Sequence, residues 1–224
     1  MPSPKSTTQM LRQLLFLLIA TVFIFACNNY ESHDELDEEG FRTVYQTDPE
    51  TGEIEGTLKQ YLPNGTLLKE ENYVAGKLEG ARQVYYEDGK LLANENYRNG
   101  AFDGAYINYY ADGQPKQRGN YTEGEMAGKW LGYYKNGALR EEVTFSENEE
   151  EGPFREWYDN GRPKASGTYV PGAKEDGILH LYTTSGELEK VMNCEVGLCR
   201  TSWTPDSTFS APEAPDMTMP NWEE

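Results

Sequence analysis

The sequence predicts an all-β fold, an elongated single-layer stack of about six β-hairpins, each built from a 24-residue repeat. Two glycine columns in phase carry this prediction. The leading glycine of each copy recurs every 24 residues, or 25 in the last interval, at Gly56, Gly80, Gly104, Gly128, Gly152 and Gly177. A second, repeat-defining glycine follows nine residues later, at Gly65, Gly89, Gly113, Gly137, Gly161 and Gly186.

The residue before the second glycine predicts the turn of each hairpin. It is Asn or Asp in five copies and Ser in the last. Asn-Gly and Asp-Gly tolerate positive φ at both central positions of a type I′ turn, whose twist suits two antiparallel strands. Each copy is therefore predicted to be a hairpin closed by a type I′ turn at this dipeptide.

Aromatic columns flank the turn on both strands. The first strand carries a ring five residues after the leading glycine, at Tyr61, Tyr85, Tyr109, Tyr133, Trp157 and Tyr182. The second strand carries another, at Tyr73, Tyr97, Tyr121, Phe145 and Tyr169. One hairpin cannot bury such a face alone, so we expect neighbouring copies to stack into a continuous ladder of rings.

Four copies have a second tyrosine directly after the first-strand ring, at Tyr86, Tyr110, Tyr134 and Tyr158. Adjacent strand residues point to opposite faces, so both faces of the sheet carry rings. This column is a candidate binding face, because a regular row of tyrosines stacks on sugars or docks a peptide. Packing within the sheet is the alternative, and it is the commoner use of strand aromatics.

The combined pattern of leading glycine, tyrosine pair, Asn/Asp-Gly turn, second-strand aromatic and closing glycine resembles the MORN-repeat superfamily. It is most similar to the bacterial variant repeat, found in proteins labelled YwqK-type antitoxins, and covers about two-thirds of the chain. The resemblance implies a twisted hairpin stack over residues 56–202 and little about chemistry, since a fold is not a function. The eukaryotic motif has a shorter period, so lipid-binding roles proposed for it are not carried over.

Residues 1–26 have the layout of a signal peptide. They hold Lys5 and Arg12, no acidic residue, and an apolar run that is short for a membrane span. The run ends in Ala-Cys before polar residues, which resembles a bacterial lipoprotein signal with Cys27 as the lipidated first residue. Ile24 and Phe25 depart from that pattern, and a cleaved ordinary signal or an uncleaved anchor remain alternatives. The lipid would be the only contact with the membrane.

Three segments complete the predicted organisation. Residues 27–40 are expected to be an acidic disordered tether, with a surface-export signal similar to those of Bacteroidetes lipoproteins as the alternative. Residues 41–55 are expected to supply an N-terminal capping strand. Residues 203–224 combine prolines with Ser, Thr, Asp and Glu and are expected to be a disordered tail.

Cys194 and Cys199 are predicted to form a disulfide that pins the last hairpin. They are the only cysteines besides Cys27, and a lipoprotein lies outside the reducing cytoplasm. A metal site that recruits His180 and a redox pair are the alternatives. The first lacks nearby ligands, and the second normally uses a tighter spacing.

The sequence favours a scaffold over an enzyme, with no cofactor and no metal. Its two histidines, His33 and His180, form no catalytic constellation with a nucleophile. Calcium binding by the acidic run Glu147 to Glu151 is an alternative, but that run lacks an alternating ligand pattern and is better explained as a charged loop.

The charge limits the partners. The formal net charge of −18 moves near −20 if residues 1–26 are removed, which excludes nucleic acid as a natural ligand. The predicted function is a lipid-anchored scaffold of the bacterial cell envelope that binds an unidentified envelope protein or glycan. The alternative is antitoxin-like neutralisation of a basic partner protein. The open sheet edges leave the oligomeric state undecided.

Overall fold

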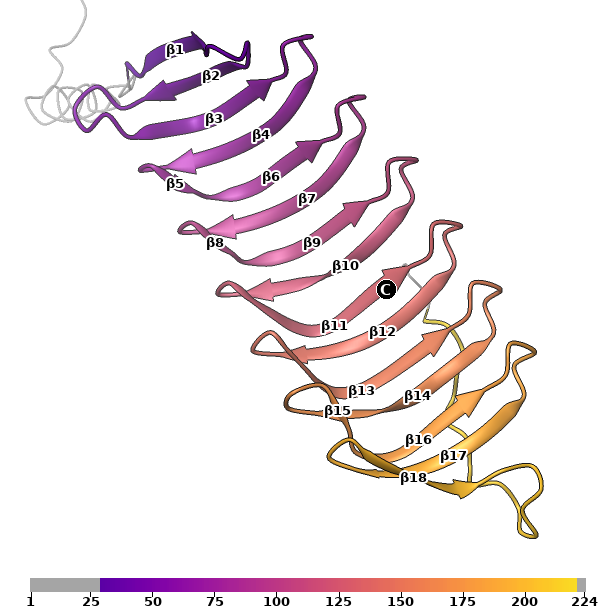
Figure 1. Cartoon of the computed structure of the whole chain (residues 1–224). Coiled ribbons are helices and arrows are strands. Elements are labelled where there is room, and N and C mark those ends of the chain that lie inside the picture. Colours follow the sequence, from indigo (N-terminus) through magenta and orange to yellow (C-terminus); the bar gives the residue numbers. More distant parts are fainter. Residues whose placement is uncertain (1–28, 221–224) are drawn as a thin grey trace, which may run out of the picture.

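A computed structural model describes residues 29–220, which form one open antiparallel sheet of 18 strands. Each strand pairs with its neighbours in chain order, so the sheet lengthens hairpin by hairpin into an elongated single layer (Figure 1). The predicted all-β, single-layer fold is confirmed. Among the described residues no helix has the length and apolar character needed to cross a membrane.

The strands repeat in three classes. The first strands of the six hairpins are β3 (Ile54–Tyr61), β6 (Gly80–Tyr85), β9 (Gly104–Tyr109), β11 (Glu125–Tyr133), β13 (Glu149–Trp157) and β16 (Gly177–Tyr182). Their second strands are β4 (Leu67–Val74), β7 (Leu91–Arg98), β10 (Pro115–Thr122), β12 (Leu139–Ser146), β14 (Pro163–Val170) and β17 (Leu188–Glu195). Short bridging strands between hairpins are β5 (Lys77–Leu78), β8 (Ala101–Phe102) and β15 (Lys174–Glu175), and the ends carry β1 (Glu31–Leu36), β2 (Arg42–Thr47) and β18 (Leu198–Trp203).

The Asn-Gly turn differs from the predicted type. In the first hairpin Gly65 has φ of 86°, whereas Asn64 is absent from the residues with positive φ. The Gly65 N–H donates to the Leu62 carbonyl, and the Asn64 side chain accepts from the Thr66 N–H. The prediction of a type I′ turn here is wrong. The loop has three residues and keeps only its glycine in the left-handed region, as in a type I turn followed by a bulge.

Consecutive positive-φ residues occur instead at the turns that join one hairpin to the next. Ala75 and Gly76 have φ of 48° and 69°, and the same pairing recurs at Asn99 and Gly100. The amide of each closing glycine also donates to the preceding repeat, with Gly76 bonded to the Ile54 carbonyl at 3.0 Å. The left-handed turn therefore both reverses the chain and joins adjacent repeats.

The ring-to-ring contacts of the repeats lie on one face, here called the ladder face, which carries Trp130, Phe154 and the second-strand rings. Trp130 is 2% exposed, and its ring centroid lies 5.1 Å from that of Tyr121 and 6.0 Å from that of Phe145. Phe154 stacks on Tyr169 with centroids 4.2 Å apart. The two Trp130 contacts are edge-to-face and the Phe154 contact is stacked, and together such contacts form the ladder of rings that the repeat period predicted.

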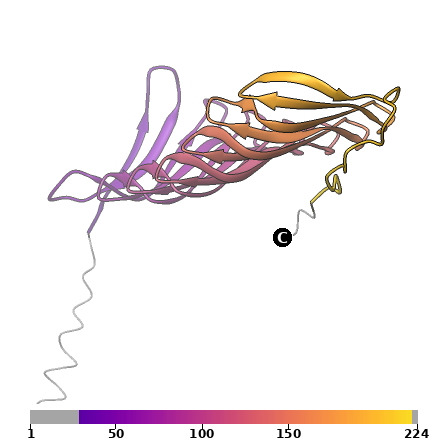
Figure 2. The same ribbon diagram turned by 90° about the horizontal axis from the view of Figure 1, so that it is seen from below.

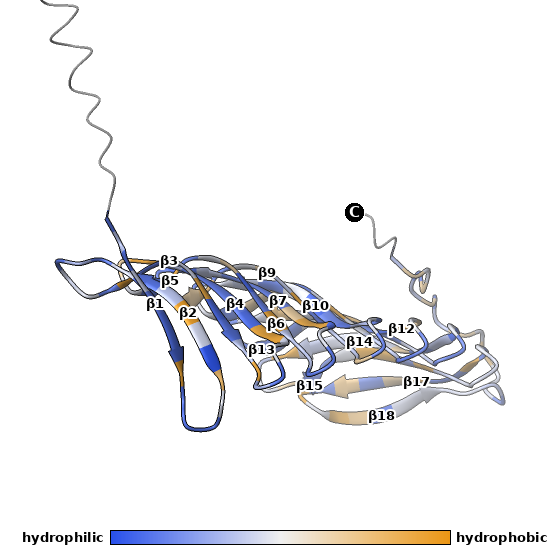
Figure 3. Ribbon diagram, turned by 90° about the horizontal axis from the view of Figure 1, so that it is seen from above, coloured by the Kyte–Doolittle hydropathy of each residue, from blue (hydrophilic) through white to orange (hydrophobic). Residues whose placement is uncertain are grey.

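The first two hairpins fill the same face with charges. Glu71, which is 3% exposed, lies 2.6 Å from Arg82 of the next hairpin, and Arg82 lies 2.7 Å from Glu95 on the paired strand of its own hairpin. Each buried carboxylate thereby gains a charge-assisted partner, which burial requires. In Figure 3 blue and orange segments alternate along the strands, and hydrophilic colours dominate β1 and β2.

The N-terminal acidic segment is ordered, contrary to the predicted tether. Strand β1 pairs with β2 over six residues, so residues 41–55 supply one strand of a hairpin rather than a lone cap. Asp34 makes a bidentate pair with Arg42, with both distances 2.7 Å, and Glu35 accepts from the Tyr45 hydroxyl at 2.8 Å. An exposed edge strand needs no apolar face when cross-strand polar pairs replace it. This hairpin projects from the end of the stack (Figure 3).

The C-terminal segment is also ordered over residues 204–220, contrary to the predicted disordered tail. It leaves β18 and runs back along one face of the sheet (Figure 2). Cys194 and Cys199 form a disulfide between directly paired positions of β17 and β18. The predicted signal peptide of residues 1–26 and the lipidation site Cys27 lie outside the described residues.

Candidate binding groove on the tail face

The face opposite the ladder face is here called the tail face, because residues 204–220, the tail, lie along it. It carries every second residue of each strand, including Arg155 and Trp157 of β13, Ser166 of β14 and His180 of β16. Trp157 occupies the first-strand aromatic column and is 0% exposed. A tryptophan this buried on a single-layer sheet requires a cover, and the tail supplies it.

Arg155 is held in one orientation by its neighbours. Its Nη2 donates to Glu142 Oε2 at 2.9 Å, and Lys129 approaches the other oxygen of that carboxylate at 3.1 Å. The guanidinium carbon lies 5.5 Å from the centre of the Trp157 ring. The carboxylate on one side and the indole on the other leave Nη1 directed at the tail.

Arg155 and Trp157 bind the tail through its main chain. Arg155 Nη1 donates to the carbonyls of Asp216 and Thr218, at 3.1 and 3.2 Å. Trp157 Nε1 donates to the carbonyl between them, that of Met217, at 3.0 Å. Three consecutive backbone carbonyls are thus recognised by two side chains.

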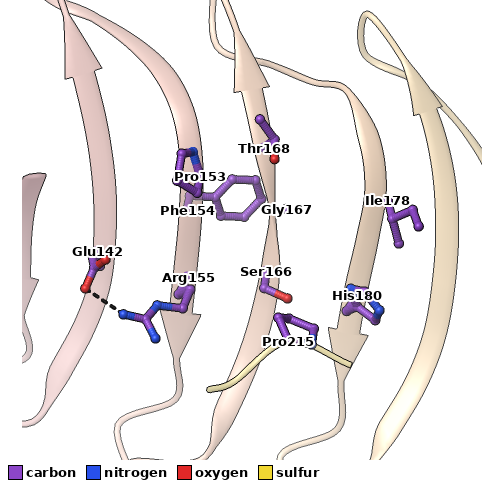
Figure 4. Close-up of a pocket in the computed structure, with 10 residues that line it drawn as sticks. All are labelled: Glu142, Pro153, Phe154, Arg155, Ser166, Gly167, Thr168, Ile178, His180 and Pro215. Carbon is purple, nitrogen blue, oxygen red and sulfur yellow. Dashed lines mark hydrogen bonds and ion pairs between the residues drawn. The ribbon is translucent and has the colours of Figure 1, made fainter. Parts of the chain in front are cut away.

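Two hollows lie beside this contact and form a groove. The first, of about 280 Å³, is lined from β12 to β16 and receives Pro215 of the tail between Ser166 and His180 (Figure 4). The second, of about 590 Å³, is lined by β9 to β12 and by Pro220. Glu142 lines both hollows, so they adjoin as one groove that crosses four hairpins, from β9 to β16.

Besides the ion-paired Glu142 and Arg155, the first hollow is lined by the polar residues Ser166 and His180. Burial lowers the pKa of His180, and a hydrogen bond to the Glu213 backbone offsets this only in part. The ring is therefore uncharged near neutral pH. Burial raises the pKa of Tyr182, which lies two residues along the same strand. Neither group carries a charge that would select an ionic ligand.

Comparison with known families agrees with the repeat geometry. Five segments match the family described as MORN repeat variant, at residues 54–75, 78–99, 102–123, 126–147 and 150–170. The chain carries five MORN repeat variants. They coincide with the hairpins that begin at β3, β6, β9, β11 and β13, and the sixth hairpin, β16–β17, continues the same pairing beyond the matched segments.

Other comparisons add little to the MORN repeats. No match was found among curated protein sequences. One matching solved structure is described as "Crystal Structure of TarM", with 13% identity over 65% of this chain and 25% of that chain. The chain thus spans about a quarter of that protein's length, and the TM-score of 0.28 is too low for any conclusion.

The second tyrosine column joins consecutive MORN repeats. Each hydroxyl donates to the carbonyl of the first-strand aromatic in the next hairpin, at distances of 2.6 to 3.0 Å, in the pairs Tyr86 to Tyr109, Tyr110 to Tyr133, Tyr134 to Trp157 and Tyr158 to Tyr182. These four rings are half-buried. The structure thus gives them a role in stacking, and a role in binding ligands stays a prediction.

The remaining predicted features lie apart from the groove. The second glycines have φ between 78° and 86° in most copies, and 91° in Gly113, at the tips of the hairpins. Glu149 to Glu151 begin β13 instead of forming the expected loop, while Glu147 stays in the turn. In the described part of the chain no three His, Cys, Asp or Glu side chains gather as a metal site would require.

The groove residues themselves were missed from the sequence. Arg155 has different residues at the equivalent positions of the other repeats, such as Leu131 and His180, so no column reveals it. One signal existed, because Trp157 is the single tryptophan in a column of tyrosines and its indole N–H needs an acceptor when buried.

Proposed function

We propose that this chain is a lipid-anchored protein of the bacterial envelope whose MORN-repeat sheet is a non-catalytic scaffold. The scaffold binds another envelope protein through the tail face. The observation that supports this best is the continuous groove on one side of the repeat array, with Glu142 shared by its two hollows. Concave sites that combine apolar walls with a few placed polar groups are typical of binding surfaces.

Capture of the partner tests this function. Mature protein purified from detergent-solubilised envelopes should carry one stoichiometric envelope protein that mass spectrometry identifies. The Arg155→Gln variant should recover at least fivefold less of it, because Arg155 points into the groove. Lys190→Gln is the matched control, since Lys190 lies opposite Leu181 on the ladder face, and it should leave recovery unchanged.

The capture experiment has two opposing outcomes. Recovery of a polysaccharide in place of a protein would move the scaffold to glycan binding. Equal loss of the partner in both variants, or no bound macromolecule at all, would contradict binding through the tail face. Melting temperatures of the variants show whether reduced recovery reflects unfolding.

Antitoxin-like neutralisation is the second candidate, and the net charge of −18 supports it. An acidic protein attracts a basic partner over several ångströms and accelerates their association at low salt. Recovery of a small basic protein, released by raising the salt concentration, would favour this function over a scaffold.

The anchor is tested separately. Cells that express the wild-type chain should incorporate labelled palmitate into the protein, and cells that express Cys27→Ser should not, because Cys27 supplies the acylated thiol in a lipoprotein. Palmitate labelling of the Cys27→Ser protein would refute the lipoprotein assignment.

A further inference from the structure

We propose that the tail is an internal occupant of the groove and that the external partner binds there as an extended, proline-containing polypeptide segment that displaces it. This inference rests on the proposed scaffold function and names the chemistry of its partner. The tail shows what the groove accepts, because Arg155 and Trp157 donate hydrogen bonds to its main chain and one of its prolines lines each hollow.

The contacts are made with the backbone of the tail. Asp216, Met217 and Thr218 each offer a carbonyl, which every amino acid possesses, to Arg155 or Trp157. Recognition of this kind depends on an extended main chain more than on side-chain identity. A segment of another protein with the same conformation can therefore make the same three hydrogen bonds.

Proline suits these contacts for two reasons. Proline has no N–H but keeps its carbonyl, so a groove that reads carbonyls loses nothing when it binds a proline-rich chain. Proline also favours the extended polyproline II conformation before binding, which lowers the entropy lost. In the tail, Pro215 lines the first hollow and Pro220 lines the second.

The spacing of these prolines matches the groove. In a displacing segment, five residues of polyproline II would span about 16 Å at about 3.1 Å per residue. Crossing three strands at about 4.8 Å each covers about 14 Å, which is the separation between β14 under the first hollow and β11 under the second. A chain that crosses the strands thus places one proline in each hollow.

Covalent attachment makes the tail a strong competitor. A tethered segment acts at an effective concentration of about a millimolar, so a free peptide of equal intrinsic affinity binds poorly while the tail is docked. Displacement also exposes Trp157 unless the incoming segment covers it, since this ring is 0% exposed beneath the tail. The partner must therefore fill the place of the tail rather than bind beside it.

A fluorescein-labelled peptide with the sequence of residues 210–220 tests this inference in fluorescence anisotropy. The full chain is compared with a tail variant that combines Pro212→Gly, Pro215→Gly and Pro220→Gly, which loosens the tail and leaves the groove intact. The peptide should bind the tail variant at least tenfold more tightly than the wild-type chain. Equal affinity for the two proteins would overturn the displacement mechanism.

Groove substitutions in the tail variant locate the bound peptide. Trp157→Phe removes the indole donor and Arg155→Gln removes the guanidinium, and each should weaken binding at least fivefold, whereas Lys190→Gln should not. A peptide with glycine at the three proline positions should bind at least fivefold more weakly. Unchanged affinity in both groove variants, each folded by its melting curve, would refute the assigned site, and unchanged affinity of the glycine peptide would refute the preference for proline.

The two proposals fail in different ways. A partner captured from envelopes with the same recovery by wild type and Arg155→Gln would overturn this inference and leave a scaffold that uses another surface. Peptide binding at the groove without any captured partner would keep the recognition chemistry and overturn the envelope scaffold.

Discussion

At the scale of single residues, Gly119 shows how closely the ladder face is packed. A Cβ added there would lie 2.6 Å from Trp130 Cγ. The Trp130 ring cannot move away from this Cβ, because the ring is itself buried among its neighbours. We expect Gly119→Ala to lower the free energy of unfolding by about 2 to 3 kcal/mol, the range for overpacking. Urea denaturation followed by circular dichroism measures this.

Gly132→Ala is the matched control for that substitution. A Cβ at Gly132 would lie 2.5 Å from Glu141 Oε1 and 2.9 Å from a nitrogen of Arg140, both of which are ends of flexible side chains that can move. Neither Gly119 nor Gly132 has positive φ, so backbone strain does not distinguish them. We expect a loss under about 1 kcal/mol for Gly132→Ala. Equal losses would show that Trp130 is not rigidly packed.

The carboxylate of Glu71 predicts a dependence of stability on pH. Burial alone would raise its pKa, but hydrogen bonds from Lys69 and Arg82 outweigh burial and leave the pKa below 4.5. Because the pKa of Glu71 is lower in the folded state than in the unfolded state, the ionised carboxylate stabilises the fold. This stabilisation is fully present above about pH 5 and is lost as the pH falls through the folded pKa. The free energy of unfolding should therefore fall more steeply on acidification from about pH 5 to about pH 3 in the wild type than in Glu71→Gln.

Acidification also reduces the charge repulsion within an acidic chain, and this affects both proteins alike. The difference between the wild type and Glu71→Gln therefore reports on Glu71 alone. Parallel stability curves for the wild type and Glu71→Gln, determined by urea denaturation at each pH, would contradict a functioning ion pair in the first hairpins.

At the scale of the hairpin, the tyrosines of the second column join neighbouring repeats through hydrogen bonds. Tyr134 donates to the Trp157 carbonyl at 3.0 Å, one hairpin further along. We expect Tyr134→Phe to lower the free energy of unfolding by about 1 kcal/mol, since a typical net hydrogen bond contributes about that much. Tyr109→Phe is the control, because the Tyr109 hydroxyl makes no hydrogen bond with the described residues. Chemical denaturation measures the free energy of unfolding of both variants. Equal losses in Tyr134→Phe and Tyr109→Phe would show that the hydrogen bond of Tyr134 does not stabilise the contact between repeats.

The hairpin is also the scale at which sequence reasoning succeeds. Spacing alone predicts the strands, because Gly56 and its counterparts mark the start of each unit and Gly65 and its counterparts mark the tip. The turn type was not predictable from Asn64 and Gly65, since the same dipeptide serves both a two-residue turn and a three-residue loop. The number of residues between paired positions decides between these, and that number is a property of the register.

The predictions for the two ends of the chain were wrong because they rested on amino-acid composition. The structure of both segments depends instead on the residues that each segment contacts. Strand β1 is acidic, yet Arg42 and Tyr45 of β2 face its carboxylates. The tail is rich in proline, yet the hydrogen bonds that Arg155 and Trp157 donate to it use its carbonyls alone. Arg42, Tyr45 and Arg155 lie in no repeat column, and Trp157 differs from its column only in being a tryptophan. The sequence therefore does not show which segment each of these residues binds.

At the scale of the whole molecule, the two faces have different roles. The ladder face holds the ring-to-ring contacts of the repeats and the buried cluster around Phe154, which stabilise the stack, while the tail face has a groove that residues of the tail help to line. In a single-layer repeat array no second sheet covers either face, and each repeat contacts only its neighbours. One face is therefore open for binding, and the tail lies along it. In the function proposed above, a partner replaces the tail there.

Photo-cross-linking from position 178 tests this division of roles most directly. Ile178 is 54% exposed and lines the same hollow as Pro215 of the tail. With benzoylphenylalanine in place of Ile178, irradiation of the purified full chain should yield an intramolecular cross-link to residues 213–220, mapped by mass spectrometry. Cross-links that avoid this segment, or that join only separate molecules, would show that the tail does not occupy the groove and would contradict the account.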